Sequence, residues 1–232
     1  MCAAPLPTAL PPLGQAARQR GVSLVLVLLI LVGVSLLGAA AMRMAMLNER
    51  SARNERDAQM AFQAAQAALL DAELDLHQGR AQVRFDGTSS AGFEPGCAAA
   101  APFQGLCSVV LAGAPAWMTV DFVQTDAAHS TALGTFTART LVVGKGGLTP
   151  AQAPRYIIEL VADPTPGLPV PRYLYLVTAV GFGPRADIQV ALQALYRPLA
   201  DPSASQNTQP SVTQKRLSWR KVENFQEINL GP

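Results

Sequence analysis

The sequence predicts an α+β protein in which one long N-terminal helix packs on an antiparallel β-sheet. Three observations favour this class: an uncharged apolar run over residues 22–42, a helical pattern that continues from it to Gly79 with no proline or glycine after Gly38, and several strand-like segments after residue 107 that are separated by turns. About 20 apolar residues are enough to span a bilayer as a helix. We therefore expect the first helix to anchor the chain and the rest to fold beyond it.

The second part of the predicted helix carries an apolar stripe. Apolar residues at intervals of three and four lie on one face of an α-helix. The stripe consists of Phe62, Ala65, Leu69, Ala72 and Leu76. We expect this face to pack on the sheet, and a coiled coil is the alternative interpretation.

Two cysteines enclose a short loop that is rich in Ala, Pro and Gly. Cys97 and Cys107 follow the membrane segment, whereas Cys2 precedes it. A pair of this kind on the exported side of a membrane favours a disulfide in the periplasm, which would stabilise the fold by about 2–3 kcal/mol. Two unpaired buried thiols are the alternative.

Six segments have strand-like composition, and glycine- and proline-containing turns separate them. They are 108–111, 117–123, 135–143, 155–161, 172–182 and 187–196. The last two read as a hairpin, with alternating apolar residues in the second arm. The region 198–214 is rich in Pro, Ser, Gln and Asn and is expected to be mobile.

The C-terminal tail gathers basic residues around Trp219. The four cations are Lys215, Arg216, Arg220 and Lys221. A basic and aromatic cluster is one signature of nucleic-acid binding, but acidic residues follow closely and the formal net charge of the chain is only +2. So small a charge does not indicate a polyanionic partner. We interpret the tail as a terminal strand or edge cover and expect no nucleic-acid partner.

No catalytic motif is present, so the sequence predicts neither an enzyme nor a cofactor. The nucleophile elbow, the P-loop, the zinc HExxH motif and the dinucleotide fingerprint are all missing, and the glycines around Lys145 read as a turn. Several acidic residues and histidines are expected in solvent or as caps, and no metal site is predicted: Asp71, Glu73, Asp75, His77 and His129. Three loop carboxylates could gather around calcium, but they lack EF-hand spacing: Asp121, Asp126 and Asp163.

The start of the apolar run resembles a class III prepilin leader. Arg18-Gln19-Arg20-Gly21 is followed at once by Val22-Ser23-Leu24-Val25-Leu26. The resemblance implies that prepilin peptidase cuts after Gly21 and that Val22 becomes a methylated N-terminus. Arg18 and Arg20 favour a cytoplasmic N-terminal side by the positive-inside rule. A cleaved secretory signal ending near Ala41 is the rival interpretation, but it leaves the helical pattern beyond unexplained.

The next part of the helix resembles the N-terminal region of PilX-type minor pilins. The similarity covers roughly residues 18–75, and its most specific parts are Asn-Glu-Arg-Ser-Ala-Arg-Asn-Glu-Arg-Asp at 48–57 and Ala-Phe-Gln-Ala-Ala-Gln-Ala-Ala-Leu-Leu-Asp-Ala-Glu at 61–73. It implies a pilin-like fold with a leader (1–21), a transmembrane and stalk helix (22–80) and a periplasmic sheet domain (81–232). It also implies a minor pilin of the type IV pilus, moving from the inner membrane into the fibre. Its partners would be other minor pilins, the major pilin and prepilin peptidase, and its roles pilus biogenesis, adhesion and twitching motility.

Leu26 departs from the usual pilin pattern. It occupies the fifth mature position, where most pilins have a Glu that is thought to pair with the N-terminal amine of a neighbouring subunit. A subunit at the fibre tip has no amine ahead of it, so an apolar residue suits a tip or priming role; simple divergence is the alternative. Two other functions stay open, the large pseudopilin of type II secretion and a single-pass periplasmic binding or sensor module.

Overall fold

The structure is a computed structural model. It begins with one long α-helix, α1 (Val22–Gln78). The described residues are 22–110, 113–123, 128–144, 149–165, 167, 172–200 and 212–229. The chain divides into two units, Met1–Ser51 and Ala52–Pro232, and α1 contributes to both. The helix ends where the sequence predicts, because Gly79 adopts a left-handed conformation (φ +70°) and its N–H binds the Asp75 carbonyl at 2.9 Å.

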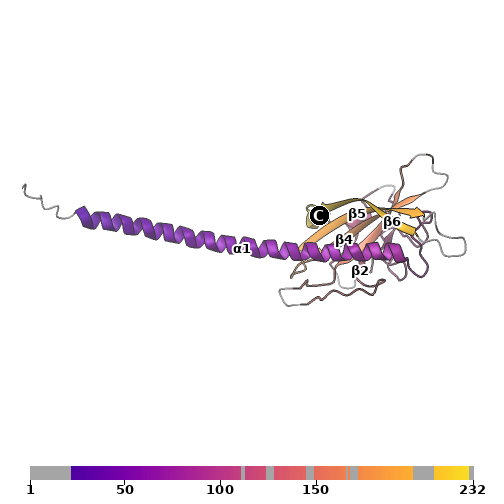
Figure 1. The fold of residues 1–232 in the computed structure, drawn as a ribbon, viewed down its shortest axis with the longest axis horizontal. Helices are drawn as coiled ribbons and strands as arrows, with labels where there is room; N and C mark the ends of the chain where they lie inside the picture. Colours follow the sequence, from indigo (N-terminus) through magenta and orange to yellow (C-terminus); the bar gives the residue numbers. More distant parts are fainter. Residues whose placement is uncertain are drawn as a thin grey trace, which may run out of the picture. The chain divides into compact units, whose positions relative to one another are not determined.

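The second unit is built on a sheet of six strands among the described residues. The strands are β1 (Leu106–Cys107), β2 (Thr131–Ala132), β3 (Arg155–Ala162), β4 (Tyr173–Phe182), β5 (Gln189–Ala200) and β6 (Val212–Val222). The long strands β3 to β6 follow one another as an antiparallel meander, in which Ile158 faces Val177 and Val177 faces Ala194. At the other side of β3, β1 pairs with it in parallel and β2 antiparallel. Figure 1 labels β2, β4, β5 and β6 of this sheet.

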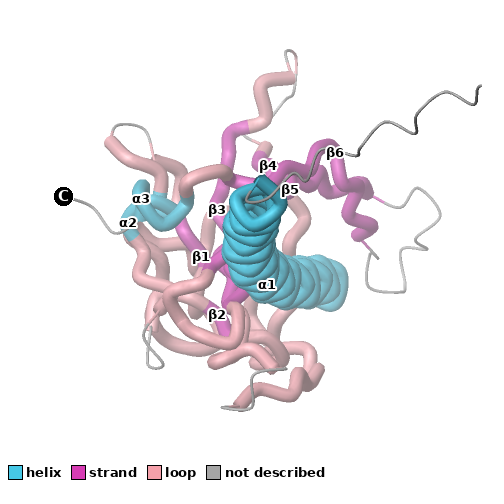
Figure 2. Tube along the Cα trace, turned by 90° about the vertical axis from the view of Figure 1, so that its left-hand side faces the viewer, coloured by secondary structure: helices cyan, strands magenta, loops and turns pink. Residues whose placement is uncertain are grey.

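The predicted α+β class is confirmed, with α1 against one face of the sheet (Figure 2). On this face alanines and leucines of α1 pack on buried tyrosines of the strands, Tyr156, Tyr175 and Tyr196. The opposite face carries a second core beneath two short helices, α2 (Ala116–Thr119) and α3 (Phe225–Asn229), in which the main aromatic residues are Trp117, Phe122, Phe182 and Phe225.

Three of the six predicted strands form, and three do not. Segments 155–161, 172–182 and 187–196 correspond to β3, β4 and β5, and the predicted hairpin is the β4–β5 pair. The prediction was wrong for the described parts of 108–111, 117–123 and 135–143, which hold turns, coil and α2 instead. Strand propensity alone does not decide which segments pair with the sheet, and the segments that pair with the outer edge of β3 are β1 and β2.

The region predicted to be mobile, 198–214, is partly strand. β5 extends to Ala200 and β6 begins at Val212, while 201–211 lies outside the described residues. The basic tail forms β6, the strand at the edge of the sheet. This confirms the prediction that the tail is a terminal strand or edge cover.

Candidate assembly site

The first unit exposes an apolar helical surface. From Val22 to Met42 the sequence of α1 carries no charge, and its large apolar side chains are exposed on the surface of the helix; Leu37, for example, is 73% exposed. Within the described residues, α1 is the one helix whose length and composition would allow it to cross a membrane. An exposed apolar surface of this extent marks a site of contact with a membrane or with other protein chains.

The predicted processing residues lie at the start of this surface. Val22 is the first residue of α1 and Leu26 follows one turn later, and both side chains are exposed. Gly21, Arg18 and Arg20 lie outside the described residues. Cleavage after Gly21 therefore stays a prediction.

In the second unit, α1 buries a face of small residues against the sheet. Four residues of the predicted stripe are buried, Ala65, Leu69, Ala72 and Leu76. Phe62 is half-buried and meets the Trp219 ring edge-on, with 6.4 Å between the ring centroids. Because strands cover the stripe, the coiled-coil alternative does not hold.

Gly181 on β4 lets the helix backbone rest directly on the sheet. A Cβ atom at this position would lie 2.1 Å from the Ala65 nitrogen and 2.2 Å from the Ala61 carbonyl oxygen. The alanines of α1 serve the same purpose from the other side, since Ala61, Ala65 and Ala68 are fully buried. The closest approach of helix and sheet is thus set by backbone atoms.

Two carboxylates that the sequence places in solvent are instead buried on the packed face of α1. Asp71 and Asp75 are 0% and 1% exposed. The prediction was wrong because both residues have polar partners from distant segments. Asp75 accepts hydrogen bonds from the Arg80 guanidinium, at 2.6 Å for Nη2 to Oδ2, and from the Tyr156 hydroxyl at 2.8 Å. Burial raises the pKa of Tyr156, and the charge of Asp75 adds to the rise.

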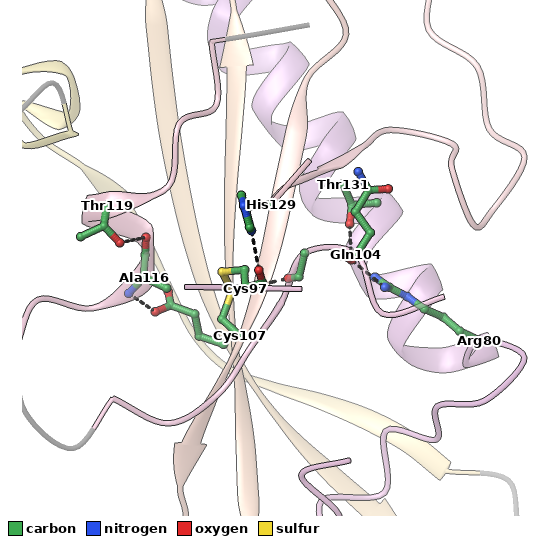
Figure 3. The surroundings of a disulfide bond; sticks show 10 residues. Arg80, Cys97, Gln104, Cys107, Ala116, Thr119, His129 and Thr131 are labelled. Atoms are coloured by element: carbon green, nitrogen blue, oxygen red, sulfur yellow. Dashed lines mark hydrogen bonds between the residues drawn. A yellow bond between two sulfur atoms is a disulfide. The ribbon is translucent and has the colours of Figure 1, made fainter. Parts of the chain in front are cut away.

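Arg80 and Asp71 extend this network to two loops. The Nη1 group of Arg80 donates to the carbonyls of Pro102 at 2.9 Å and Gln104 at 2.7 Å, and Figure 3 shows Arg80 reaching Gln104. Asp71 accepts from the Gly134 N–H at 2.8 Å and from the Thr137 hydroxyl. The end of α1 therefore fixes both loops at once. The signal in the sequence was the spacing of four between the two acids, directly beside Ala72 and Leu76 of the stripe.

The predicted disulfide is present, and one of the two loops lies inside it. Cys97 and Cys107 are joined, with both residues buried (Figure 3). Cys107 belongs to β1, so the bridge connects the loop to the sheet. His129 Nδ1 lies 2.6 Å from the Cys97 carbonyl oxygen, which makes this histidine a cap on the loop. The alternative of two free thiols is wrong.

Comparison with known families gives two matches. Residues 20–70 match the family model described as PilX N-terminal, and residues 78–198, more than half of the chain, match the model described as type IV pilus assembly protein PilX C-term. The chain belongs to the PilX family. No curated protein and no solved structure matches it. PilX-family proteins are structural pilins, and with its apolar N-terminal helix this member corresponds to a pilin anchored in the inner membrane.

The two described loop carboxylates of this PilX-family protein that the sequence considers for calcium, Asp121 and Asp163, have protein partners. No group of three or more His, Cys, Asp or Glu residues suited to a metal is found in the described part of the chain. Asp121 accepts from the Val123 N–H at 2.7 Å, and Asp163 binds Arg197 at 3.1 Å. The pKa of Asp163 is lowered, first by its hydrogen bond from the Thr165 hydroxyl. Asp126 and residues 145–148 lie outside the described residues.

Glu159 is the one buried carboxylate of the described sheet strands that faces α2. Its Oε1 accepts from the Ala116 N–H at 2.8 Å, whereas its buried Oε2 has no hydrogen-bond partner. Burial raises the pKa of Glu159 to about 7, although the backbone hydrogen bonds from Ala116 and Trp117 oppose the rise. The residue holds the start of α2 on the sheet.

Proposed function

We propose that the chain is a minor pilin that acts by assembly. Prepilin peptidase removes residues 1–21, the N-terminal part of α1 stays in the inner membrane, and the second unit folds in the periplasm. The family matches over residues 20–70 and 78–198 support this proposal. The observation that carries it is the exposed, uncharged surface of α1 from Val22 to Met42.

The same apolar surface suits both states of a pilin. In the membrane it contacts lipid tails, and in the fibre it contacts the equivalent helices of neighbouring subunits. Gly33 and Gly38 have no atoms near their Cβ positions, which leaves room for close helix packing at these sites. Extraction from the bilayer then exchanges one apolar environment for another, so the cost of transferring α1 is small.

Leu26 favours a position at the tip or in the priming complex. A buried ionised Glu costs several kcal/mol unless a neighbouring amine pairs with it, and an apolar side chain avoids that cost where no subunit lies ahead. Adhesion and twitching motility are the activities that a tip subunit would support. In cells that carry an epitope-tagged chain, gold labelling confined to fibre ends would agree with this position, and labelling along the shaft would contradict it.

We propose no catalytic role for the chain. Its polar groups are used to hold loops on α1 and the sheet, as Asp75 and Arg80 do. The partners are therefore the other minor pilins, the major pilin, the peptidase and the membrane.

The mass of the N-terminal peptide tests the proposal. Protein is isolated from membranes of cells with active and with disabled prepilin peptidase, and the N-terminal peptide is analysed by mass spectrometry. We expect a peptide that begins at methylated Val22 in the first sample and an intact leader in the second. An intact leader in both samples, or a cut near Ala41, would return the chain to the class of anchored binding modules.

A further inference from the structure

The two edges of the sheet differ in how they are protected. On one side, β1 and β2 cover the outer edge of β3, and the disulfide stabilises the loop that leads into β1. On the other side, β6 is the last strand and pairs with β5 alone among the described residues. Figure 2 shows β1 and β2 at one side of the sheet and β6 at the other.

The free edge of β6 is long and open. The strand has 11 residues, and from Lys215 to Lys221 every side chain is exposed. Natural proteins usually keep edge strands short or cover them, because unpaired N–H and C=O groups invite pairing with another chain. An edge of this length is therefore suited to the addition of a strand.

The side chains of β6 combine an aromatic residue with cations. Trp219 is 46% exposed even though it packs on Phe62, and Leu217 beside it is 40% exposed. Lys215 and Arg216 precede these residues, and Arg220 and Lys221 follow the tryptophan. Arg220 also donates to Gln193 Oε1 at 2.6 Å, and Lys221 lies 3.3 Å from Glu223 in an exposed ion pair. Half-exposed tryptophan next to arginine is typical of binding hot spots, where both residue types are enriched.

The charge of β6 disfavours pairing with a second copy of the chain. In an antiparallel pair centred on Ser218, Lys215 would face Lys221 and Arg216 would face Arg220; an in-register parallel pair would place every cation beside its equivalent. Like charges directly opposite each other destabilise a strand pair. A partner strand with acidic side chains would instead complement these cations.

We propose that the outer edge of β6 binds an extended, acidic segment of a different protein of the pilus assembly, which joins the sheet as an additional strand. This inference rests on the proposed function. Backbone hydrogen bonds along the edge supply affinity, Trp219 and Leu217 give apolar contact, and the cations select acidic residues at neighbouring positions of the incoming strand. The surface thus makes this pilin a heterotypic docking subunit.

The test uses the full chain in detergent micelles at physiological salt. The probe is a fluorescent peptide as long as β6 in which Glu and Val alternate, and binding is followed by fluorescence anisotropy. One comparison peptide has Lys in place of Glu. Another has Pro in place of Val, which keeps the charge but prevents strand pairing, because proline lacks the N–H group. We expect binding of the Glu–Val peptide only.

Charge reversal on β6 locates the site. The double variant Lys215→Glu/Lys221→Glu should weaken binding of the Glu–Val peptide by about tenfold or more, since two attractions become two repulsions. The matched control is Arg84→Glu/Arg185→Glu, which changes the net charge equally at exposed positions outside β6 and should bind like the parent. Circular dichroism verifies that both variants are folded.

Three results would overturn the inference. They are no binding of the Glu–Val peptide, equal binding of the Glu–Pro peptide, which would mean attraction by charge alone, and equal loss of binding in both double variants. A correctly cleaved and methylated chain that fails to bind the peptide would leave the pilin proposal intact. A chain that binds the peptide but keeps its leader would overturn the pilin proposal instead.

Discussion

Asp75 and Arg80 form an ion pair whose side chains are both 0% exposed. Such a pair is stable only if its remaining hydrogen-bonding groups are satisfied, because both charges have left water. Here Tyr156 and the carbonyls of Pro102 and Gln104 complete the network. The pair therefore forms a joint, that is, a rigid connection between α1, β3 and the disulfide loop.

Replacement of one partner of this joint should strongly destabilise the second unit. Asp75→Ala leaves the guanidinium of Arg80 buried without its counter-charge, and we expect the free energy of unfolding to fall by about 3–5 kcal/mol. Denaturant titration of the full chain in micelles, followed by circular dichroism, measures the change. The control is Asp187→Ala, which removes an ion pair with Arg185 whose side chains are 67% and 71% exposed. That change should cost about 0.5 kcal/mol or less, and equal losses in the two variants would contradict the assigned role.

Glu159 should make the stability of the fold depend on pH. Its pKa is raised to about 7 by burial, so the native state holds the proton more tightly than the unfolded chain does. The stabilisation is complete below the ordinary Glu pKa of about 4.5 and is lost as the pH rises through about 7. The full loss is on the order of 3 kcal/mol.

The variant Glu159→Gln isolates this effect because an amide does not ionise. We expect the parent to become less stable relative to the variant between pH 5 and pH 8, as measured by the thermal unfolding midpoint. Glu55→Gln, at an exposed position of α1, should show no such trend. A parent–variant difference that stays constant across this range would show that Glu159 does not titrate there.

At the scale of single elements, the contact between α1 and β4 depends on the absence of a side chain at Gly181. In Gly181→Ala the new Cβ atom would lie 2.1 Å from the backbone nitrogen of Ala65. Backbone atoms cannot move out of the way by a change of rotamer, as a flexible side chain can. We expect a loss of about 3 kcal/mol in unfolding free energy. In the control Gly144→Ala the nearest atom is 3.8 Å away, so its stability should stay close to that of the parent. A stable Gly181→Ala protein would mean that α1 can shift along or away from the sheet.

The disulfide loop is the second element with a measurable contribution. The double variant Cys97→Ser/Cys107→Ser releases a loop with a sequence separation of 10, and chain-entropy arithmetic predicts a loss of about 2–3 kcal/mol. The same loss should appear when the parent is unfolded under reducing conditions. If reduction has no effect on the denaturation midpoint, the hydrogen bonds of Arg80, His129 and Thr131 hold the loop in place without the disulfide.

For the molecule as a whole, the sequence predicts elements whose pattern is local. The length of α1 follows from the uninterrupted run up to Gly79, and β3 to β5 follow from apolar runs bounded by turns. The cysteine pair follows from spacing and compartment. The wrongly predicted parts depend on partners far along the chain. Asp71, for example, lies beside Ala72 of the stripe, but the groups that make its burial possible belong to Gly134 and Thr137, and no local pattern identifies those partners.

The same limit explains the misassigned strand at 135–143. Its Val142 and Val143 have good strand propensity, but propensity does not say whether a segment meets a strand with which it can pair. Gly181 was also missed, and the tail was predicted as a terminal strand or edge cover without its exposed edge being recognised, since both features acquire meaning only through tertiary neighbours. The exposed apolar surface of α1 could thus be predicted from the sequence, whereas the exposure of the outer edge of β6 could not.

The arrangement of α1 and the sheet also determines the order in which the polypeptide can fold as it is synthesised. The alanine and leucine face of α1 is synthesised early, but the strands that cover it begin only at Arg155 in β3 and Tyr173 in β4. Until then this face is exposed to other nascent chains, and domains whose key contacts are distant in sequence fold slowly and are prone to aggregation. Because alanine side chains are small, they limit the apolar surface that α1 exposes to other chains before the strands cover it. A chaperone would therefore be needed mainly for the interval between the synthesis of Leu76 and that of Phe182.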